Sequence, residues 1–204
     1  FMLLSSQSSA LQTLAIGDAT CVPVSGDFDA DQKSDPALYS AAAGQMAVWL
    51  SDSGYAMAST PLGGAGWLAA SADYDGDGKT DPGVYHPASG TWMVLLSASA
   101  YAPASGVTMG GAGFVPVPGD YDGDGKADLM VYQPGAGFWQ CTFSAQGYTT
   151  SQSATGFGGP TMAALAGGDY DNDGKADPAV CDPAARIFSV MLSGSNYSVS
   201  SMNW

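Results

Sequence analysis

The sequence predicts an all-β fold, built as an array of four-stranded antiparallel units that follow one another along the chain. A pattern of apolar, glycine-rich and aspartate-rich segments recurs four times in the 204 residues, with its Asp-rich part at spacings of 46, 47 and 49 residues. No segment keeps a 3.6-residue apolar period for three turns, and Gly or Pro interrupts the chain every eight to twelve residues. Such interruption is typical of short strands joined by turns.

Each repeat divides into four predicted strands. The first leads into the Asp-rich segment, as at Val115–Val117, and the second follows it, as at Met130–Tyr132. The third is an aromatic strand such as Trp92–Leu96, and the fourth begins near a tyrosine such as Tyr101. Four-stranded units of about 40 to 50 residues are typical of β-propeller blades. We therefore predict propeller blades, with a stacked β-solenoid as the alternative, although its coils are normally shorter.

The repeats fill one domain over residues 1–204, and the N-terminus carries an additional half blade. Residues 1–18 match the third and fourth strands of a repeat, which makes them a hairpin with an open edge. Either the chain is a piece of a larger propeller, or this half blade pairs with a strand of another chain. The predicted units are the half-blade hairpin 1–18 and the repeats 19–62, 63–109, 110–157 and 158–204.

Charge is concentrated in the four Asp-rich windows. All 19 acidic residues are Asp, 16 of them lie in these windows, and the formal net charge is −14. This balance argues against nucleic acid as a partner, because phosphate contacts need Lys and Arg, and against docking to an anionic membrane. No apolar run reaches about 18 residues, so we expect no membrane insertion. The rest of the surface is poor in charge, so either hydroxyl side chains keep it soluble or neighbouring subunits cover it.

Every window has the nine-residue pattern D-x-D-x-D-x-K-x-D, which predicts a calcium loop. Ca²⁺ prefers six to eight oxygen ligands, whereas Mg²⁺ requires a tighter octahedron. The carboxylates at positions 1, 3, 5 and 9 can converge on one ion as the backbone curls, and the Lys at position 7 can add its backbone carbonyl. We expect about four Ca²⁺, one per loop. The predicted ligands are Asp27, Asp29, Asp31, Lys33 and Asp35; Asp73, Asp75, Asp77, Lys79 and Asp81; Asp120, Asp122, Asp124, Lys126 and Asp128; and Asp169, Asp171, Asp173, Lys175 and Asp177.

These loops differ from EF-hands. An EF-hand needs a bidentate Glu at position 12 and flanking helices, but position 12 here is Leu38, Val84, Val131 or Val180, inside a predicted strand. Position 6 is Gly in three loops, as a sharp turn favours. The first loop has Gln32 at this position and is the weakest match to the pattern.

The repeats resemble the FG-GAP (VCBS-type) family. The resemblance rests on the loop, on the V-P-V-x-G-D approach at Val22–Asp27 and Val115–Asp120, on the V-Y-x-P exit at Val84–Pro87 and Val131–Pro134, and on the Phe-Gly segment at Phe157–Pro160. It implies the calcium-bearing blades of integrin-type β-propellers, which are usually extracellular and used for adhesion or recognition. It leaves the blade number open, since propellers of this family often have seven blades.

No catalytic constellation is evident, so we expect a non-enzymatic protein. His86 is the only histidine, and its counterparts in the other repeats are Ser, Gln and Asp. No nucleophile elbow is present, and almost every Asp belongs to a loop. The three cysteines occupy different phases of the repeat and form no zinc cluster with His. We expect them to be small buried apolar residues.

The expected function is an extracellular or cell-surface calcium-binding propeller with a structural or adhesive role, for example as a subunit of a surface or filamentous assembly. Its partners would be other protein chains, or copies of itself, that bind through exposed strand edges. The alternative is a lectin-like propeller that binds glycans. Aromatic side chains could stack on sugars in that case, although packing within the blades is the preferred explanation for them. They are Trp49, Trp67, Trp92 and Trp139, with Tyr55, Tyr101 and Tyr148.

Overall fold

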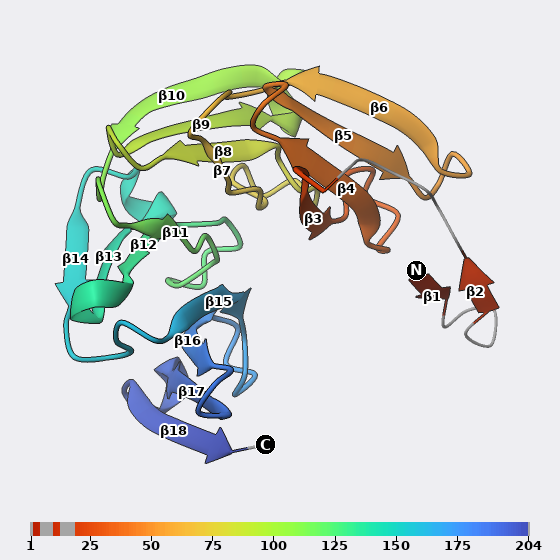
Figure 1. Ribbon diagram of the computed structural model, residues 1–204. Helices are drawn as coiled ribbons and strands as arrows, with labels where there is room; N and C mark the ends of the chain where they lie inside the picture. Colours follow the sequence, from red (N-terminus) through yellow and green to blue (C-terminus); the bar gives the residue numbers. More distant parts are fainter. Residues whose placement is uncertain (1, 5–9, 13–18, 204) are drawn as a thin grey trace.

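The protein is all-β: four antiparallel four-stranded sheets follow one another as the blades of a β-propeller (Figure 1). The fold is seen in a computed structural model that describes residues 2–4, 10–12 and 19–203. Blade 1 holds β3 (Val22–Gly26), β4 (Asp35–Ser40), β5 (Gln45–Leu50) and β6 (Ala56–Pro61). Blade 2 holds β7 (Leu68–Ala69), β8 (Gly83–His86), β9 (Thr91–Leu96) and β10 (Ala102–Thr108). Blade 3 holds β11 (Val115–Pro116), β12 (Leu129–Gln133), β13 (Phe138–Thr142) and β14 (Ser151–Ala154). Blade 4 holds β15 (Ala163–Gly168), β16 (Asp177–Asp182), β17 (Ile187–Leu192) and β18 (Ser198–Asn203).

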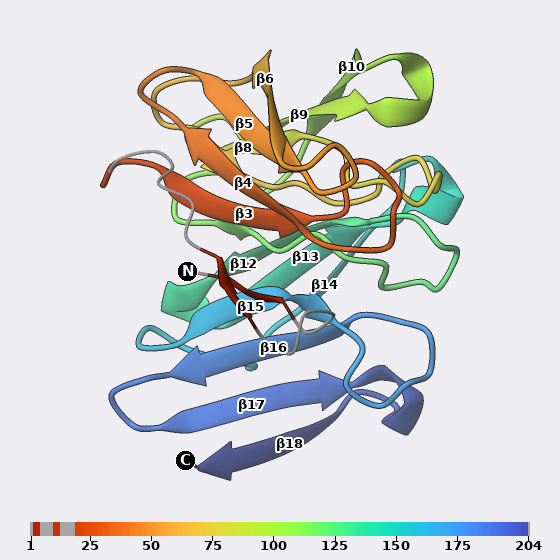
Figure 2. The same cartoon turned by 90° about the vertical axis from the view of Figure 1, so that its right-hand side faces the viewer.

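The strands of each blade pair in chain order, so the predicted meander is confirmed. Figure 1 shows the first strand of each blade on the inner side of the arc and the fourth strand on the outer side. Figure 2 shows the blades following one another around this arc. Because every blade is a meander, its Asp-rich loop and the turn between its third and fourth strands lie at the same end of the sheet. This shared end is where the candidate metal sites are built.

The predicted N-terminal half blade is seen in part. β1 (Met2–Leu4) pairs antiparallel with β2 (Ala10–Gln12), with Met2 opposite Gln12. This hairpin lies in the opening between blade 1 and blade 4 (Figures 1 and 2). The other residues of the 1–18 prediction, which are 1, 5–9 and 13–18, lie outside the described residues, as does residue 204. In the described part of the chain, no helix is long and apolar enough to cross a membrane.

The core lies between the blades. The exit tyrosine and the tryptophan of one blade pack against each other with tilted rings, whose centroids are 5.0 Å apart for Tyr85 and Trp92 and 4.4 Å apart for Tyr132 and Trp139. The second strand of the next blade covers them, as where Val131 packs in the same cluster as Tyr85 and Trp92. Trp92 and Trp139 are only 2% and 3% exposed. Trp92 and Trp139 therefore pack in the core, which is one of the two roles considered for the aromatic residues.

Of the three cysteines, all expected to be buried, one is buried in the structure. Cys141 is buried between blades 3 and 4. Its burial raises the pKa of its thiol far above the ordinary value, which keeps the group neutral and unreactive. Cys21 and Cys181 are half-buried.

Candidate metal centres

Each Asp-rich window forms the loop between the first and second strands of its blade, and its position-1 Asp organises the curl. In the first loop, Asp27 Oδ1 accepts a hydrogen bond from the Ala30 amide at 2.6 Å, and Oδ2 accepts one from the Gln32 amide at 2.7 Å. The second loop repeats the first of these bonds between Asp73 and the Gly76 amide at 2.7 Å. The backbone therefore wraps around the first carboxylate, as the spacing predicts.

This wrapping forces positions 4 and 6 into left-handed backbone conformations. In the second loop these positions are Gly76 and Gly78, with φ of 79° and 87°. Such conformations cost glycine little. In the first loop, Ala30 and Gln32 adopt φ of 67° and 65°, which strains a residue with a Cβ. Gln32 at position 6, which makes this loop the weakest match to the pattern, is thus held in a strained backbone conformation.

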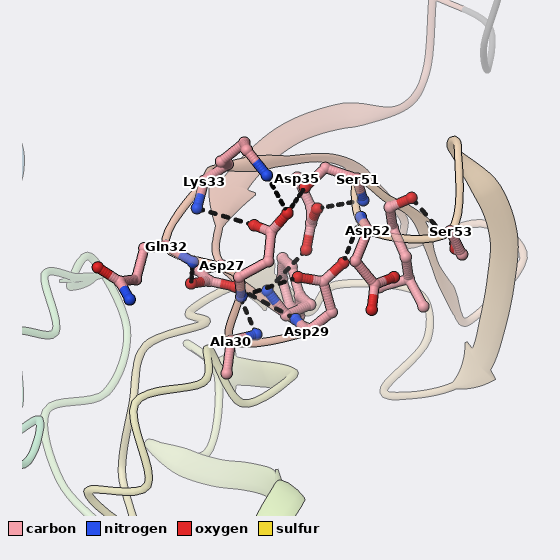
Figure 3. A network of polar contacts seen from close by, with 12 residues as sticks. Asp27, Asp29, Ala30, Gln32, Lys33, Asp35, Ser51, Asp52 and Ser53 are labelled. Atoms are coloured by element: carbon pink, nitrogen blue, oxygen red, sulfur yellow. Dashed lines mark hydrogen bonds and ion pairs between the residues drawn. The ribbon is translucent and has the colours of Figure 1, made fainter.

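Three carboxylates in every loop converge on one point. Oxygen atoms from positions 1, 3 and 9 lie within 4.8 Å of one another in all four loops. Figure 3 shows this arrangement in the first loop, where Asp27, Asp29 and Asp35 come together from the curl of the chain and the start of β4. Each group could hold a metal ion. The four triads are Asp27, Asp29 and Asp35; Asp73, Asp75 and Asp81; Asp120, Asp122 and Asp128; and Asp169, Asp171 and Asp177.

The position-9 Asp carries a charge into the interior of the blade. Asp81 and Asp128 are both 0% exposed. Burial raises the pKa of each, while amide hydrogen bonds to the carboxylate, such as those from Ser97 and Tyr74 to Asp81, act in the opposite direction. These amides lie 2.7 Å and 2.9 Å from the two oxygens of Asp81. The carboxylate is therefore fixed in place and poorly hydrated, which favours a cation beside it.

The position-5 Asp, predicted as a fourth carboxylate ligand, makes different contacts. In the second loop, Asp77 Oδ1 accepts the Lys79 amide at 2.9 Å, and its Oδ2 accepts the Ser97 hydroxyl at 2.8 Å. In the first loop, Asp31 also forms an ion pair with the Lys33 ammonium group, whose hydrogen bond is the main cause that lowers the pKa of Asp31. The structure thus brings positions 1, 3 and 9 together, whereas position 5 joins the loop to the neighbouring turn. The ligand role of position 5 and of the four Lys carbonyls stays a prediction.

A serine that was not singled out in the sequence completes each site. It begins the turn between the third and fourth strands, and it donates its amide to the position-9 carboxylate and its hydroxyl to the position-5 carboxylate. In the third loop, Ser144 makes these bonds to Asp128 and Asp124 at 2.7 Å and 2.8 Å. The sequence does hold a signal for these residues, since a Ser lies 16 residues after position 9 in every repeat. They are Ser51, Ser97, Ser144 and Ser193.

The residues present fit a hard divalent cation. All three converging groups are carboxylates, and oxygen is the ligand that such cations prefer. Two of these oxygens, Asp122 Oδ2 and Asp171 Oδ1, are buried and have no hydrogen-bond partner. A buried oxygen without a partner is costly, and a bound cation would satisfy it.

The other candidate residues form no comparable cluster. His86 is half-buried, with Nδ1 2.9 Å from Ser89 Oγ and its ring 5.1 Å from that of Trp67. Asp182, outside the loops, accepts the Thr161 hydroxyl at 2.6 Å and the amides of the following turn. That hydroxyl is the main cause that lowers the pKa of Asp182. In the part of the chain that the structure describes, the Asp loops are the sites where three or more potential ligands meet.

Comparisons with known proteins bear on the repeat family and the fold. The family described as FG-GAP repeat matches residues 112–154, which run from the approach to β11 through β14. No curated protein matches the chain. Among solved structures, a streptogramin B lyase is similar with a TM-score of 0.57, 11% identity and 97% coverage of this chain. A catalytically inactive virginiamycin B lyase from Staphylococcus aureus with quinupristin is similar with a TM-score of 0.54, 8% identity and 95% coverage.

Both similarities concern the fold alone, because the identities are so low, and the chain spans 59% of the length of each lyase. The family match covers the third blade, whose Asp loop recurs in all other repeats and whose V-Y-x-P exit recurs in the second. The sequence-based resemblance is therefore confirmed: residues 112–154 match the FG-GAP repeat, and the propeller structure is consistent with repeats of this type.

Proposed function

We propose that this chain is a calcium-binding, non-enzymatic propeller module with a structural or adhesive role outside the cell. One observation carries the proposal: all four blades repeat the same triad of carboxylates, each with its position-9 Asp at most 1% exposed. A single acidic turn could be a solvated loop. Four equivalent ones, each holding a buried charge, favour a cation in every blade.

Calcium suits these loops better than magnesium. The triad leaves room for backbone carbonyls and water in an irregular shell of six to eight oxygens, whereas Mg²⁺ demands a near-ideal octahedron. When bound, the ion would neutralise the mutual repulsion of the three carboxylates. Binding would also feed into folding, since an ion at 100 times its Kd stabilises the folded state by about 2.7 kcal/mol per site.

Several features support a module that acts by binding. Apart from the loops, few charged residues are present, and the outer strand β18 is exposed along its whole length. It contains neither Pro nor a charged residue, two of the usual devices that protect an edge strand. The proposed partners are accordingly other chains, or copies of this one, that add to such edges. The extracellular location is favoured because weak calcium sites fill at the millimolar calcium of that compartment.

The lectin-like alternative loses part of its basis. Two of the four tryptophans that could stack on sugars, Trp92 and Trp139, lie in the core between blades. Trp49 and Trp67 are half-buried, and Trp67 already contacts the ring of His86. Among the tyrosines considered for this role, Tyr101 is exposed, so a glycan array tests the alternative.

The test is to count bound ions and measure their effect on stability. Native mass spectrometry with calcium should show four ions per chain, and addition of EGTA should lower the Tm by more than 10 °C, since the loss of several sites amounts to several kcal/mol. The variant D73N/D75N should bind three ions. A matched control, D182N, changes an Asp outside the loops and should still bind four. Absence of bound calcium at millimolar concentration, or a Tm indifferent to EGTA, would refute the proposal.

A further inference from the structure

The four Asp loops are joined to one another by direct backbone hydrogen bonds. The amide of position 8 in each following loop donates to the carbonyl of position 1 in the loop before it. The three bonds run from Thr80 to Asp27, from Ala127 to Asp73 and from Ala176 to Asp120, and each is 2.6 Å long. Position 1 is a member of the triad, and position 8 lies between two predicted ligands, so each bond connects the ligand-bearing backbone of two sites.

Side chains reinforce this connection. A Cβ built on Gly76 would lie 3.1 Å from Cγ of Lys126, and one built on Gly123 would lie 3.3 Å from Cγ of Lys175. The position-7 Lys of the third and fourth loops therefore lies over position 4 of the loop before it. A Cβ on Gly26 would fall 2.3 Å from Oγ1 of Thr80. The two loops thus approach each other too closely for one to shift without displacing the other.

The linking residue is held from its own blade as well. Ala127 is 4% exposed, and its carbonyl accepts the hydroxyl of Tyr148 at 2.8 Å. Tyr148 adopts a left-handed φ of 59°, a strained conformation for a large side chain. Its side chain packs against the core cluster that contains Ala127 and Tyr74, the position-2 residue of the preceding loop. The link between loops 2 and 3 is therefore part of a packed unit.

The four Asp loops and the three backbone hydrogen bonds between them are called the loop belt below. We propose that this belt couples the four calcium sites, so that an ion bound in one blade raises the calcium affinity of the sites in the adjacent blades. The proposal rests on the proposed function, since it concerns regulation of the same sites. An ion that orders the position-1 Asp fixes the carbonyl that the next loop uses, so the next loop loses less conformational freedom when it binds. Such shared ordering produces positive cooperativity. Because the links join only neighbours, sites 1 and 4 should not be coupled directly.

A double-mutant cycle isolates this coupling from the intrinsic affinity of each site. Position-1 and position-3 Asp are changed to Asn in one loop or in two, and the total calcium binding constant is measured by calorimetry with ion counts from native mass spectrometry. The adjacent cycle uses sites 2 and 3, D73N/D75N and D120N/D122N. The distant cycle uses sites 1 and 4, D27N/D29N and D169N/D171N, and carries the same number of substitutions.

For each cycle, the product of the wild-type and double-knockout constants is divided by the product of the two single-knockout constants. The adjacent cycle should give a ratio of at least about 5, the lower end of typical coupling between sites, and the distant cycle a ratio near 1. Equal ratios in the two cycles would overturn coupling through the belt. Four ions bound with both ratios near 1 would refute coupling but leave the proposed function intact, whereas no bound calcium would refute the function itself.

A wild-type measurement keeps the proposal testable if a double knockout fails to fold. At half saturation, coupled sites deplete the species that hold one to three ions, and native mass spectrometry counts these species directly. A distribution that matches independent sites would contradict the proposal.

Discussion

The strained first loop offers a sharp test of how backbone conformation sets loop stability. Gln32 stands at φ 65°, where the equivalent residue of the second loop is Gly78 at φ 87°. A left-handed conformation costs a residue with a Cβ about 1–2 kcal/mol. A glycine at this position avoids that cost, but it also makes the unfolded chain more flexible, which offsets about 0.4–1 kcal/mol of the stabilisation. Gln32→Gly should therefore stabilise the protein by about 0.5–1 kcal/mol.

The reciprocal change, Gly78→Gln, should destabilise it by a similar amount. A Cβ built on Gly78 meets no atom within 4 Å, so no clash adds to the conformational cost. Urea denaturation in EGTA measures both variants, with a shift of the midpoint and no change of slope as the expected signature. Gly135→Ala is the control, because its site is open and Gly135 is not among the residues with positive φ. If both swaps leave the midpoint unchanged, the strain argument is wrong.

Three further predictions concern the core, the pH dependence and the ion. Trp139 Nε1 donates to the Phe157 carbonyl at 3.0 Å, whereas the buried Nε1 of Trp92 has no partner; Trp139→Phe should therefore cost about 1–3 kcal/mol more than Trp92→Phe in chemical denaturation, because it leaves a buried carbonyl unpaired. Asp182 has a lowered pKa in the folded state because Thr161 donates to it. The contribution of Asp182 to the free energy of unfolding is thus fully present above the ordinary pKa of Asp and is lost as the pH falls through the lowered value. D182N should therefore be less stable than the wild type at pH 7, and the urea midpoints of the two proteins should converge in acid. Finally, Mg²⁺ at the same concentration should raise the Tm less than Ca²⁺; an equal shift would contradict the ion assignment.

Much of the fold could be predicted because one pattern recurs four times. The spacing of turns predicts four-stranded units, and the structure confirms them as blades paired in chain order. What the pattern leaves open is the role of side chains that face two possible environments. Trp92 and Trp139 could have faced a ligand or the next blade, and only the packing of blade on blade decides for the core.

The site was predictable as a loop but not in its detail. The spacing of four carboxylates predicts that all of them face one ion. In the structure, Asp77 also accepts a hydroxyl from Ser97, twenty residues further along the chain, and its role as a ligand stays a prediction. That contact depends on a turn between the third and fourth strands that folds back beside the loop. Local spacing cannot reveal such a contact, but comparison of the four repeats could have located the serine.

The serine that closes each site also divides every repeat into a fixed part and a variable part. From position 1 to this serine the distance is 24 residues in all four repeats, whereas from the serine to the next loop it is 22, 23 and 25 residues. All variation in repeat length therefore falls between this serine and the next loop, a stretch that holds the outer strand, the connection and the first strand of the next blade. An engineer who wishes to graft a peptide onto this scaffold would accordingly place it after this serine, for example in the connection that follows β14, and leave the 24 residues from position 1 to the serine at their natural length.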